Sequence, residues 1–164
     1  MTFTAQDASF TEAAQAYHRL WSDEGAAIVD AWERVSALTF MQSEVTAIVY
    51  EGVSSSGNRD TPMRLRASYN ADTKRSALAH ELGHRIIGQL TTRPSDLDEH
   101  RVLFLALYDV WVRIWGNEFA VRQVEFESNL RGLYDYESAW RWALSLTSEQ
   151  RLARFSEIRR SNGR

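Results

Sequence analysis

The stretch ADTKRSALAHELGHRIIGQL, residues 71–90, is the part of the sequence around which the rest can be interpreted. Its apolar residues recur at the spacing of an amphipathic helix, which predicts a helix over residues 73–90 with Asp72 or Thr73 as its cap. Glycine inside a helix costs roughly 1 kcal/mol relative to alanine, so Gly83 predicts the close approach of another element. The polar side chains expected on the solvent side of this helix are Lys74, Arg75, Arg85 and Gln89.

Within this helix, His80-Glu81-Leu82-Gly83-His84 forms an HExxH motif. Residues four apart lie on the same face of a helix, so His80 and His84 can bind one metal ion. Successive helical residues are rotated by about 100°, so Glu81 flanks that ion and need not bind it. A carboxylate there can accept a proton from a water on zinc, whose pKa the metal lowers toward about 7. The motif therefore predicts a zinc site with His80 and His84 as ligands and Glu81 as general base.

Catalytic zinc usually has three protein ligands and a water, so a third ligand is expected elsewhere in the chain. The sequence contains no cysteine and four histidines, which leaves His, Asp or Glu as donors. We expect His100 to be this ligand, because it lies near the start of the next helix, which one loop could fold back against the first. Glu99 and Glu118 are alternative carboxylate ligands, and His18 is expected to be an ordinary surface residue.

A tyrosine that donates a hydrogen bond to an oxyanion would complete such a site. Tyr108, Tyr134 and Tyr136 are the candidates, with Tyr108 put first, although most tyrosines simply bridge core and surface. Arg64 and Arg66 are expected to face solvent on a strand, which is a simpler interpretation than a site for acidic substrates.

Two stretches before the HExxH helix predict β-strands. Residues 45–53 are rich in β-branched side chains, and residues 63–69 alternate strictly between apolar and polar side chains. We expect the two strands to pair as a hairpin over residues 45–69, joined by a polar loop. The small sheet would lie next to the HExxH helix, with one edge of the 63–69 strand unpaired.

The rest of the sequence is predicted to be helical. Residues 10–35 carry apolar side chains at helical spacing, and further helices are expected within residues 96–160. Thr147 with Gln150 forms a capping box that would open the last of them. The predicted fold class is therefore α+β, as a mostly helical single domain over residues 1–164.

The HELGH sequence, preceded by two strands and followed by a second helix, resembles the zincin metallopeptidases over about residues 45–115. The resemblance implies zinc ligands at His80 and His84, with Glu81 as general base. It also implies that the 63–69 strand holds an extended peptide along its free edge.

Among the zincins, the chain resembles the small ones. Small cytoplasmic zincins of the SprT type take a third histidine from a following helix, which implies His100, whereas a gluzincin-like site would use a carboxylate. The chain differs from the metzincins, because Gln89, Leu90 and Thr91 stand where the longer HExxHxxGxxH motif continues.

Composition limits the expected partners and location. The 164 residues are 44% apolar and 25% charged, with a net charge of −3, which is typical of a globular protein and gives no sign of nucleic-acid binding. Neither an apolar run of membrane length nor a signal peptide is apparent, so we expect a cytoplasmic protein without a membrane partner. The expected function is a zinc metallopeptidase with a peptide or protein substrate. The alternatives are a zinc hydrolase of a non-peptide bond and a zincin-like binding module without turnover.

Overall fold

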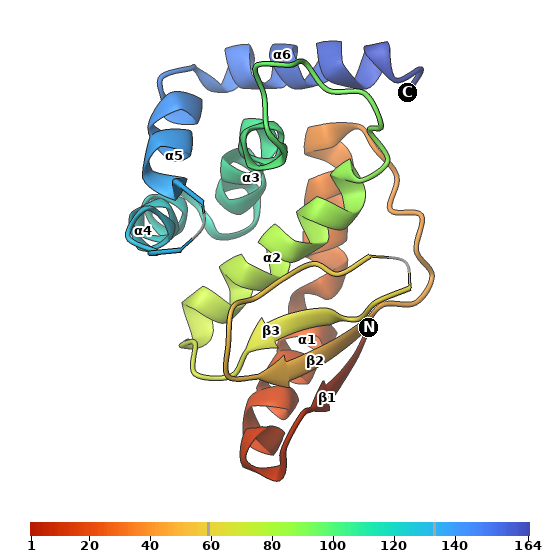
Figure 1. The fold of residues 1–164 in the computed structure, drawn as a ribbon, viewed down its shortest axis with the longest axis vertical. Coiled ribbons are helices and arrows are strands. Elements are labelled where there is room, and N and C mark those ends of the chain that lie inside the picture. Colours follow the sequence, from red (N-terminus) through yellow and green to blue (C-terminus); the bar gives the residue numbers. More distant parts are fainter. Residues whose placement is uncertain (59, 133) are drawn as a thin grey trace.

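The protein is mostly helical and contains one small sheet, an α+β architecture that the sequence predicted. The computed structural model describes residues 1–58, 60–132 and 134–164. In Figure 1 the sheet lies toward one end of the molecule and helices α3 to α6 toward the other, with α2 between them, while α1 runs behind the sheet from the lower end upward. The elements are β1 (Thr2–Ala5), a 3-10 turn (Ala8–Phe10), α1 (Thr11–Ser36), β2 (Thr46–Tyr50), β3 (Met63–Arg66), α2 (Ala71–Ile87), α3 (Glu99–Trp115), α4 (Asn117–Ser128), α5 (Tyr136–Leu144) and α6 (Ser148–Ser161).

The sheet is parallel, and the predicted hairpin over residues 45–69 is wrong. Its strand order is β1-β2-β3, and β2 runs parallel to both neighbours. β1, which the sequence analysis missed, is joined to β2 by the long helix α1, and a helical crossover of this kind brings two strands into parallel alignment. Tyr17 of α1 fixes the helix under the sheet, because its hydroxyl donates a hydrogen bond to the carbonyl of Arg66 at 3.0 Å.

The alternation predicted in the third strand is present, although β3 ends at Arg66. Met63 and Leu65 are fully buried, whereas Arg64 is exposed on the opposite face. We predicted that one edge of this strand is unpaired, and this is wrong at Arg64, in the middle of β3. Ser55, in the loop before β3, donates its N–H to the carbonyl of Arg64 at 3.0 Å and accepts the N–H of Arg64 at 2.8 Å.

Helix α2 begins and ends earlier than the predicted range of 73–90. Its cap is Asn70, whose side chain accepts a hydrogen bond from the N–H of Thr73 at 2.9 Å, so neither Asp72 nor Thr73 serves. Asn and Asp are about equally good caps, and the chain geometry after β3 decides between them.

Lys74 does not face solvent, although the sequence placed it on the solvent side of the helix. It is only 9% exposed, because its ammonium donates to the carbonyls of Ala67 and Tyr69 at the end of the strand.

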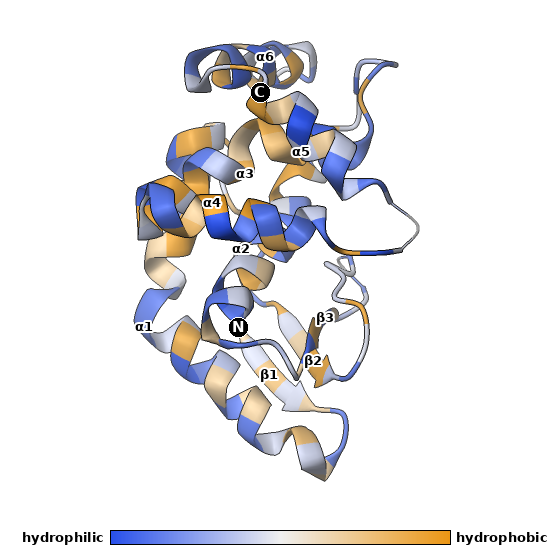
Figure 2. Ribbon diagram, turned by 90° about the vertical axis from the view of Figure 1, so that its left-hand side faces the viewer, coloured by the Kyte–Doolittle hydropathy of each residue, from blue (hydrophilic) through white to orange (hydrophobic). Residues whose placement is uncertain are grey.

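Helix α3 is the centre of the hydrophobic core. Its residues 102–107 are all buried, as expected for a helix that other elements surround. Figure 2 shows the corresponding concentration of hydrophobic residues in α3. Trp111 and Trp140 are buried in the core, and α6 opens with the predicted capping box of Thr147 and Gln150. No helix of the described residues has both the length and the apolar character that crossing a bilayer requires.

Gly83 is the point where α1 and α3 both approach α2, as its place in the helix predicted. A Cβ atom at Gly83 would lie 2.6 Å from Cδ1 of Leu103 and even closer to the indole of Trp32. Trp32 cannot easily move, because it is fully buried and its Nε1–H donates to the carbonyl of Ala79 at 2.9 Å. This close packing holds the two histidines of α2 against the start of α3.

We expect Gly83→Ala to lower the free energy of unfolding by about 1–3 kcal/mol, the usual cost of overpacking a core. This holds even though alanine gains roughly 1 kcal/mol over glycine in a helix. Urea denaturation of the metal-free protein measures the change. Gly88→Ala is the matched control, because Gly88 already has helical angles at the end of the same helix. Equal stability of the two variants would show that the contact at Gly83 is not tight.

Candidate metal centre

Three of the four histidines lie together, as the sequence analysis expected. Ligand atoms of His80, His84 and His100 all lie within 4.8 Å of one another, and they form a group of metal-ligand type within the described residues. The Nε2 atoms of His80 and His84 are 3.1 Å apart. Nitrogens bound tetrahedrally to zinc at about 2.0–2.1 Å would be roughly 3.3 Å apart. Side-chain movements of about 1.5 Å or less would therefore let all three bind one ion.

A buried carboxylate on α4 orients His80. Nδ1 of His80 lies 2.8 Å from Oε1 of Glu127, and Oε2 of Glu127 accepts a hydrogen bond from Nε1 of Trp140 at 2.9 Å. An ionised carboxylate only accepts, so Nδ1 carries the proton and the lone pair is on Nε2. A metal-binding histidine usually has such a partner on its other nitrogen.

His84 has the same arrangement with Glu99. Its Nδ1 lies 2.8 Å from Oε1 of Glu99, and the hydrogen bond from His84 lowers the pKa of Glu99 to about 2. Arg93 lies 3.4 Å from the other oxygen. The sequence indicated Glu99 as a possible metal ligand, whereas in the structure it accepts a hydrogen bond from Nδ1 of His84. Because each Nδ1 donates to a carboxylate, Nε2 is the nitrogen through which His80 and His84 can each bind a cation.

His100 lies at the start of α3, in the first turn after the cap residue Asp98. Its ring stacks on Tyr134 with the ring centres 4.1 Å apart, and its Nε2 lies 3.3 Å from the hydroxyl of Tyr136. Burial, together with His80 and His84, lowers the pKa of His100 to about 3. The ring is therefore neutral at physiological pH, which is the state that binds a metal.

The other two histidines differ in their tendency to be charged. Burial lowers the pKa of His84 and outweighs the opposing effect of the hydrogen bond that His84 donates to Glu99. Burial also acts to lower the pKa of His80, but the charge of Glu127 and its hydrogen bond together raise it above the ordinary value. Burial therefore favours the neutral ring at His84 and His100, whereas Glu127 favours the protonated ring at His80. A carboxylate lies behind each of His80 and His84, and this negative charge attracts a cation.

Glu81 is buried beside His80, with 7% of its surface exposed. Burial raises the pKa of its carboxyl to about 7, against the opposing effect of His80. Both side chains line a small cavity of about 50 Å³, which also contacts Tyr69, Phe126 and Tyr136. A carboxyl group in such surroundings can exchange a proton near neutral pH.

Glu118 and Tyr108 are not in the histidine group. Glu118 lies in the first turn of α4 and Glu127 in the last, so about 13 Å of helix separates them. Tyr108 lies eight residues after His100 on α3, roughly 12 Å along the helix axis, and its hydroxyl donates to Asn117 at 2.8 Å. Tyr136, not Tyr108, is the candidate tyrosine whose hydroxyl lies near a histidine of the group, at 3.3 Å from Nε2 of His100.

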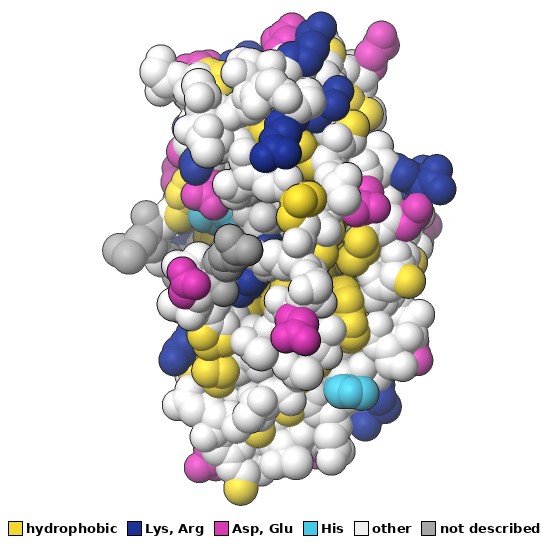
Figure 3. All heavy atoms as spheres, turned by 90° about the vertical axis from the view of Figure 1, so that its right-hand side faces the viewer, with side chains coloured by type: hydrophobic (Ala, Val, Ile, Leu, Met, Phe, Trp, Pro, Cys, Tyr) yellow, Lys and Arg dark blue, Asp and Glu magenta, His cyan; other side chains and the backbone are white. Residues whose placement is uncertain are grey.

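A larger groove of about 830 Å³ reaches the histidines from the other side. His84 and Glu99 line it, together with Arg85, Arg93 and residues 40–44 before β2. In Figure 3, one histidine side chain lies recessed below its neighbours on the face shown, while another projects from the surface. His84, one of the three grouped histidines, is therefore accessible from this groove.

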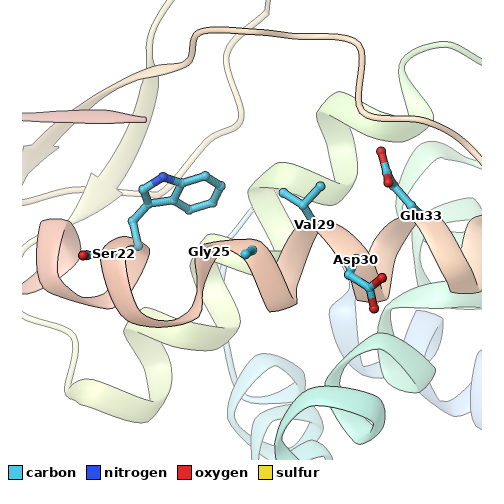
Figure 4. Close-up of a pocket in the computed structure, with 7 residues that line it drawn as sticks. Ser22, Gly25, Val29, Asp30 and Glu33 are labelled. Carbon is cyan, nitrogen blue, oxygen red and sulfur yellow. The ribbon is translucent and has the colours of Figure 1, made fainter.

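A second hollow, of about 610 Å³, runs along α1 and is drawn in Figure 4. Its two acidic side chains already have partners. Asp30 pairs with Arg34 at 2.7 Å, and Glu33 accepts the N–H of Phe40 at 2.8 Å. The hollow offers no arrangement comparable to the histidine group.

Glu127 and Trp140 are the residues that the sequence analysis missed. The sequence holds a partial signal for Glu127. Ser76 and His80 on α2 are four residues apart, and so are their partners Gln123 and Glu127 on α4. The hydroxyl of Ser76 donates to Gln123 at 2.7 Å, one turn from the contact of His80 with Glu127. All four side chains are buried. Two helices with polar residues four apart can pair in this way, but only the fold shows which helices meet.

Comparison of the chain with protein-family models, with curated proteins and with solved structures found no match.

Proposed function

We propose that the protein is a zinc-dependent peptidase with a small, zincin-like architecture. The observation that carries the proposal is the convergence of His80, His84 and His100 beside the buried carboxyl of Glu81. A purely structural metal site has no need of a buried base next to its ligands. A cytoplasmic location is part of the same proposal.

Each residue has a role that follows from its contacts. The three histidines would hold zinc, which when bound supplies a Lewis acid that activates water and polarises the substrate carbonyl. Glu81 accepts a proton from the attacking water and returns it to the leaving amine. Burial raises the pKa of Tyr136, so its hydroxyl stays protonated and can donate to the developing oxyanion.

The groove that reaches His84 supports a peptide as substrate. It is lined by His84 and Arg85 of α2, by Gln89 just after that helix, and by residues 40–44 and 56–58. The part of an extended chain on one side of the scissile peptide bond can lie in such a groove.

The proposal is tested by measuring zinc and hydrolysis in the same sample. Zinc-loaded protein should contain one zinc per chain by elemental analysis. It should also generate new N-termini in a library of unfolded proteome-derived peptides, and removal of zinc by a chelator should stop this. A loaded protein that cleaves no peptide but hydrolyses small esters or amides would favour a hydrolase of non-peptide bonds, and loss of both activities would favour a binding module.

We expect Glu127→Gln to weaken zinc binding by roughly 10–100-fold, the usual effect of removing a partner of a metal ligand. His80 and Trp140 donate to different oxygens of Glu127, and the amide would place an NH2 group, which is a donor, against one of them. Competition with a fluorescent zinc chelator measures the affinity. Glu125→Gln is the control, because Glu125 is exposed on the same helix. Unchanged affinity in Glu127→Gln would mean that the carboxylate does not orient the ligand.

A further inference from the structure

Residues 53–58, which we call the strap, lie along the outer edge of β3. Ser55 and Arg64 exchange two backbone hydrogen bonds in antiparallel geometry. The hydroxyl of Ser54 accepts the N–H of Arg66 at 3.2 Å. The strap therefore uses backbone groups of β3 that an added extended peptide would need.

The strap is also attached to α2 by Arg85, the residue directly after His84. Nε of Arg85 donates to the carbonyl of Ser56 at 2.7 Å, and a second nitrogen donates to the carbonyl of Thr61 at 3.0 Å. The strap thus lies between the edge of the sheet and the helix that carries the histidines. In Figure 1 this connection between β2 and β3 runs alongside β3 and crosses α2 in the view.

Both cavities at the histidines are lined by the strap. Val53 and Ser54 border the small cavity at His80 and Glu81. Ser56 borders the larger groove at His84, together with residues 57 and 58. An extended chain that ran from one cavity to the other past the histidines would have to lie where the strap lies.

The strap is held weakly, as a segment that moves aside would need to be. Its side chains are small, and Val53, the one large apolar side chain among them, is 79% exposed. Most of what holds it is a few hydrogen bonds at the surface, a feature of segments that open at low free energy. Gly57 has a φ of +61°, and a Cβ there would lie 2.5 Å from the carbonyl oxygen of Thr61. A residue other than glycine at this position would therefore strain the strap in its observed place.

We propose that the strap is an autoinhibitory segment that occupies the position of a peptide substrate and must leave β3 before a peptide can bind. This inference rests on the proposed function. It explains why the edge of β3 is paired although the site beside it is open to solvent through the larger groove.

A reversible disulfide tests the inference, because the chain has no cysteine of its own. Residues 55 and 64 are directly opposite in an antiparallel pair, at a separation that a disulfide can span. In the variant Ser55→Cys with Arg64→Cys, oxidation should fix the strap on β3 and reduction should release it. The site is loaded with cobalt(II), whose visible spectrum reports ligand binding, and is titrated with acetohydroxamate and with a tripeptide hydroxamate.

The oxidised variant should bind acetohydroxamate as the reduced one does, but the tripeptide hydroxamate at least tenfold more weakly. The single variants Ser55→Cys and Arg64→Cys, treated with the same oxidant, are the controls and should show no difference. Gly57→Ala should loosen the strap, and it should therefore tighten binding of the tripeptide hydroxamate. Equal binding of that probe to the oxidised and reduced forms would overturn the strap inference alone. Failure of every form to bind cobalt would instead overturn the proposed function, and the inference with it.

Discussion

Glu81→Gln is expected to keep zinc at the wild-type stoichiometry and to lose roughly 10²–10⁴-fold in the rate of peptide hydrolysis, the usual range for a general base. The amide has the shape of the carboxylate but cannot accept the proton of the attacking water. Because Glu81 is buried and replaced by a neutral group of equal size, the fold should remain intact. Single-turnover cleavage of a peptide found in the library assay measures the loss.

The matched control for this variant is Glu118→Gln. Glu118 is exposed at the far end of α4, and the structure separates it from the histidine group. Its variant should keep both zinc and activity. A Glu81→Gln protein that hydrolyses peptides as fast as the wild type would rule out Glu81 as the base.

His84→Ala and His100→Ala are expected to lose zinc almost completely. Each would leave two protein ligands, so the affinity should fall by more than the roughly 10–100-fold that loss of an outer partner causes. Hydrolysis should fall with zinc content. Equilibrium dialysis against zinc at a fixed free concentration measures the occupancy of each variant.

His18→Ala is the control, because His18 is the fourth histidine and is exposed on α1. It should bind zinc as the wild type does. If His100→Ala also kept full zinc while Glu99→Ala lost it, the third ligand would be the carboxylate and Glu99 would have to turn toward the ion.

The part of the site that lies on α2 could be predicted because local spacing determines it. His80, Glu81 and His84 take their relative positions from the geometry of one helix. Gly83 was informative for the same reason, since its cost inside a helix requires a compensating contact. His100 could be proposed from the few histidines available, and the fold then brought it to the other two.

The direction of the strands could not be predicted, because it depends on a contact distant in sequence. The patterns of residues 45–53 and 63–69 are compatible with parallel or antiparallel pairing. The parallel sheet depends on β1, only four residues long, which α1 places beside β2. The antiparallel contact that does occur is made by Ser55, in a segment that the sequence indicated only as a polar loop.

The partners behind the histidines were also beyond the sequence. Glu127 comes from α4 and Trp140 from α5, and no local pattern relates either residue to the HExxH motif. Glu99 was considered as a ligand because a gluzincin-like site would use a carboxylate. The structure instead has it bonded to the Nδ1 of His84.

X-ray absorption at the zinc edge of the loaded wild-type protein tests the central claim most directly, because it reports the type and distance of the zinc ligands. We predict three imidazole nitrogens at about 2.0–2.1 Å and one further oxygen ligand, the coordination expected for His80, His84 and His100 with water. A shell with fewer than three imidazoles, or a six-coordinate shell of oxygens at longer distance, would contradict the proposed site.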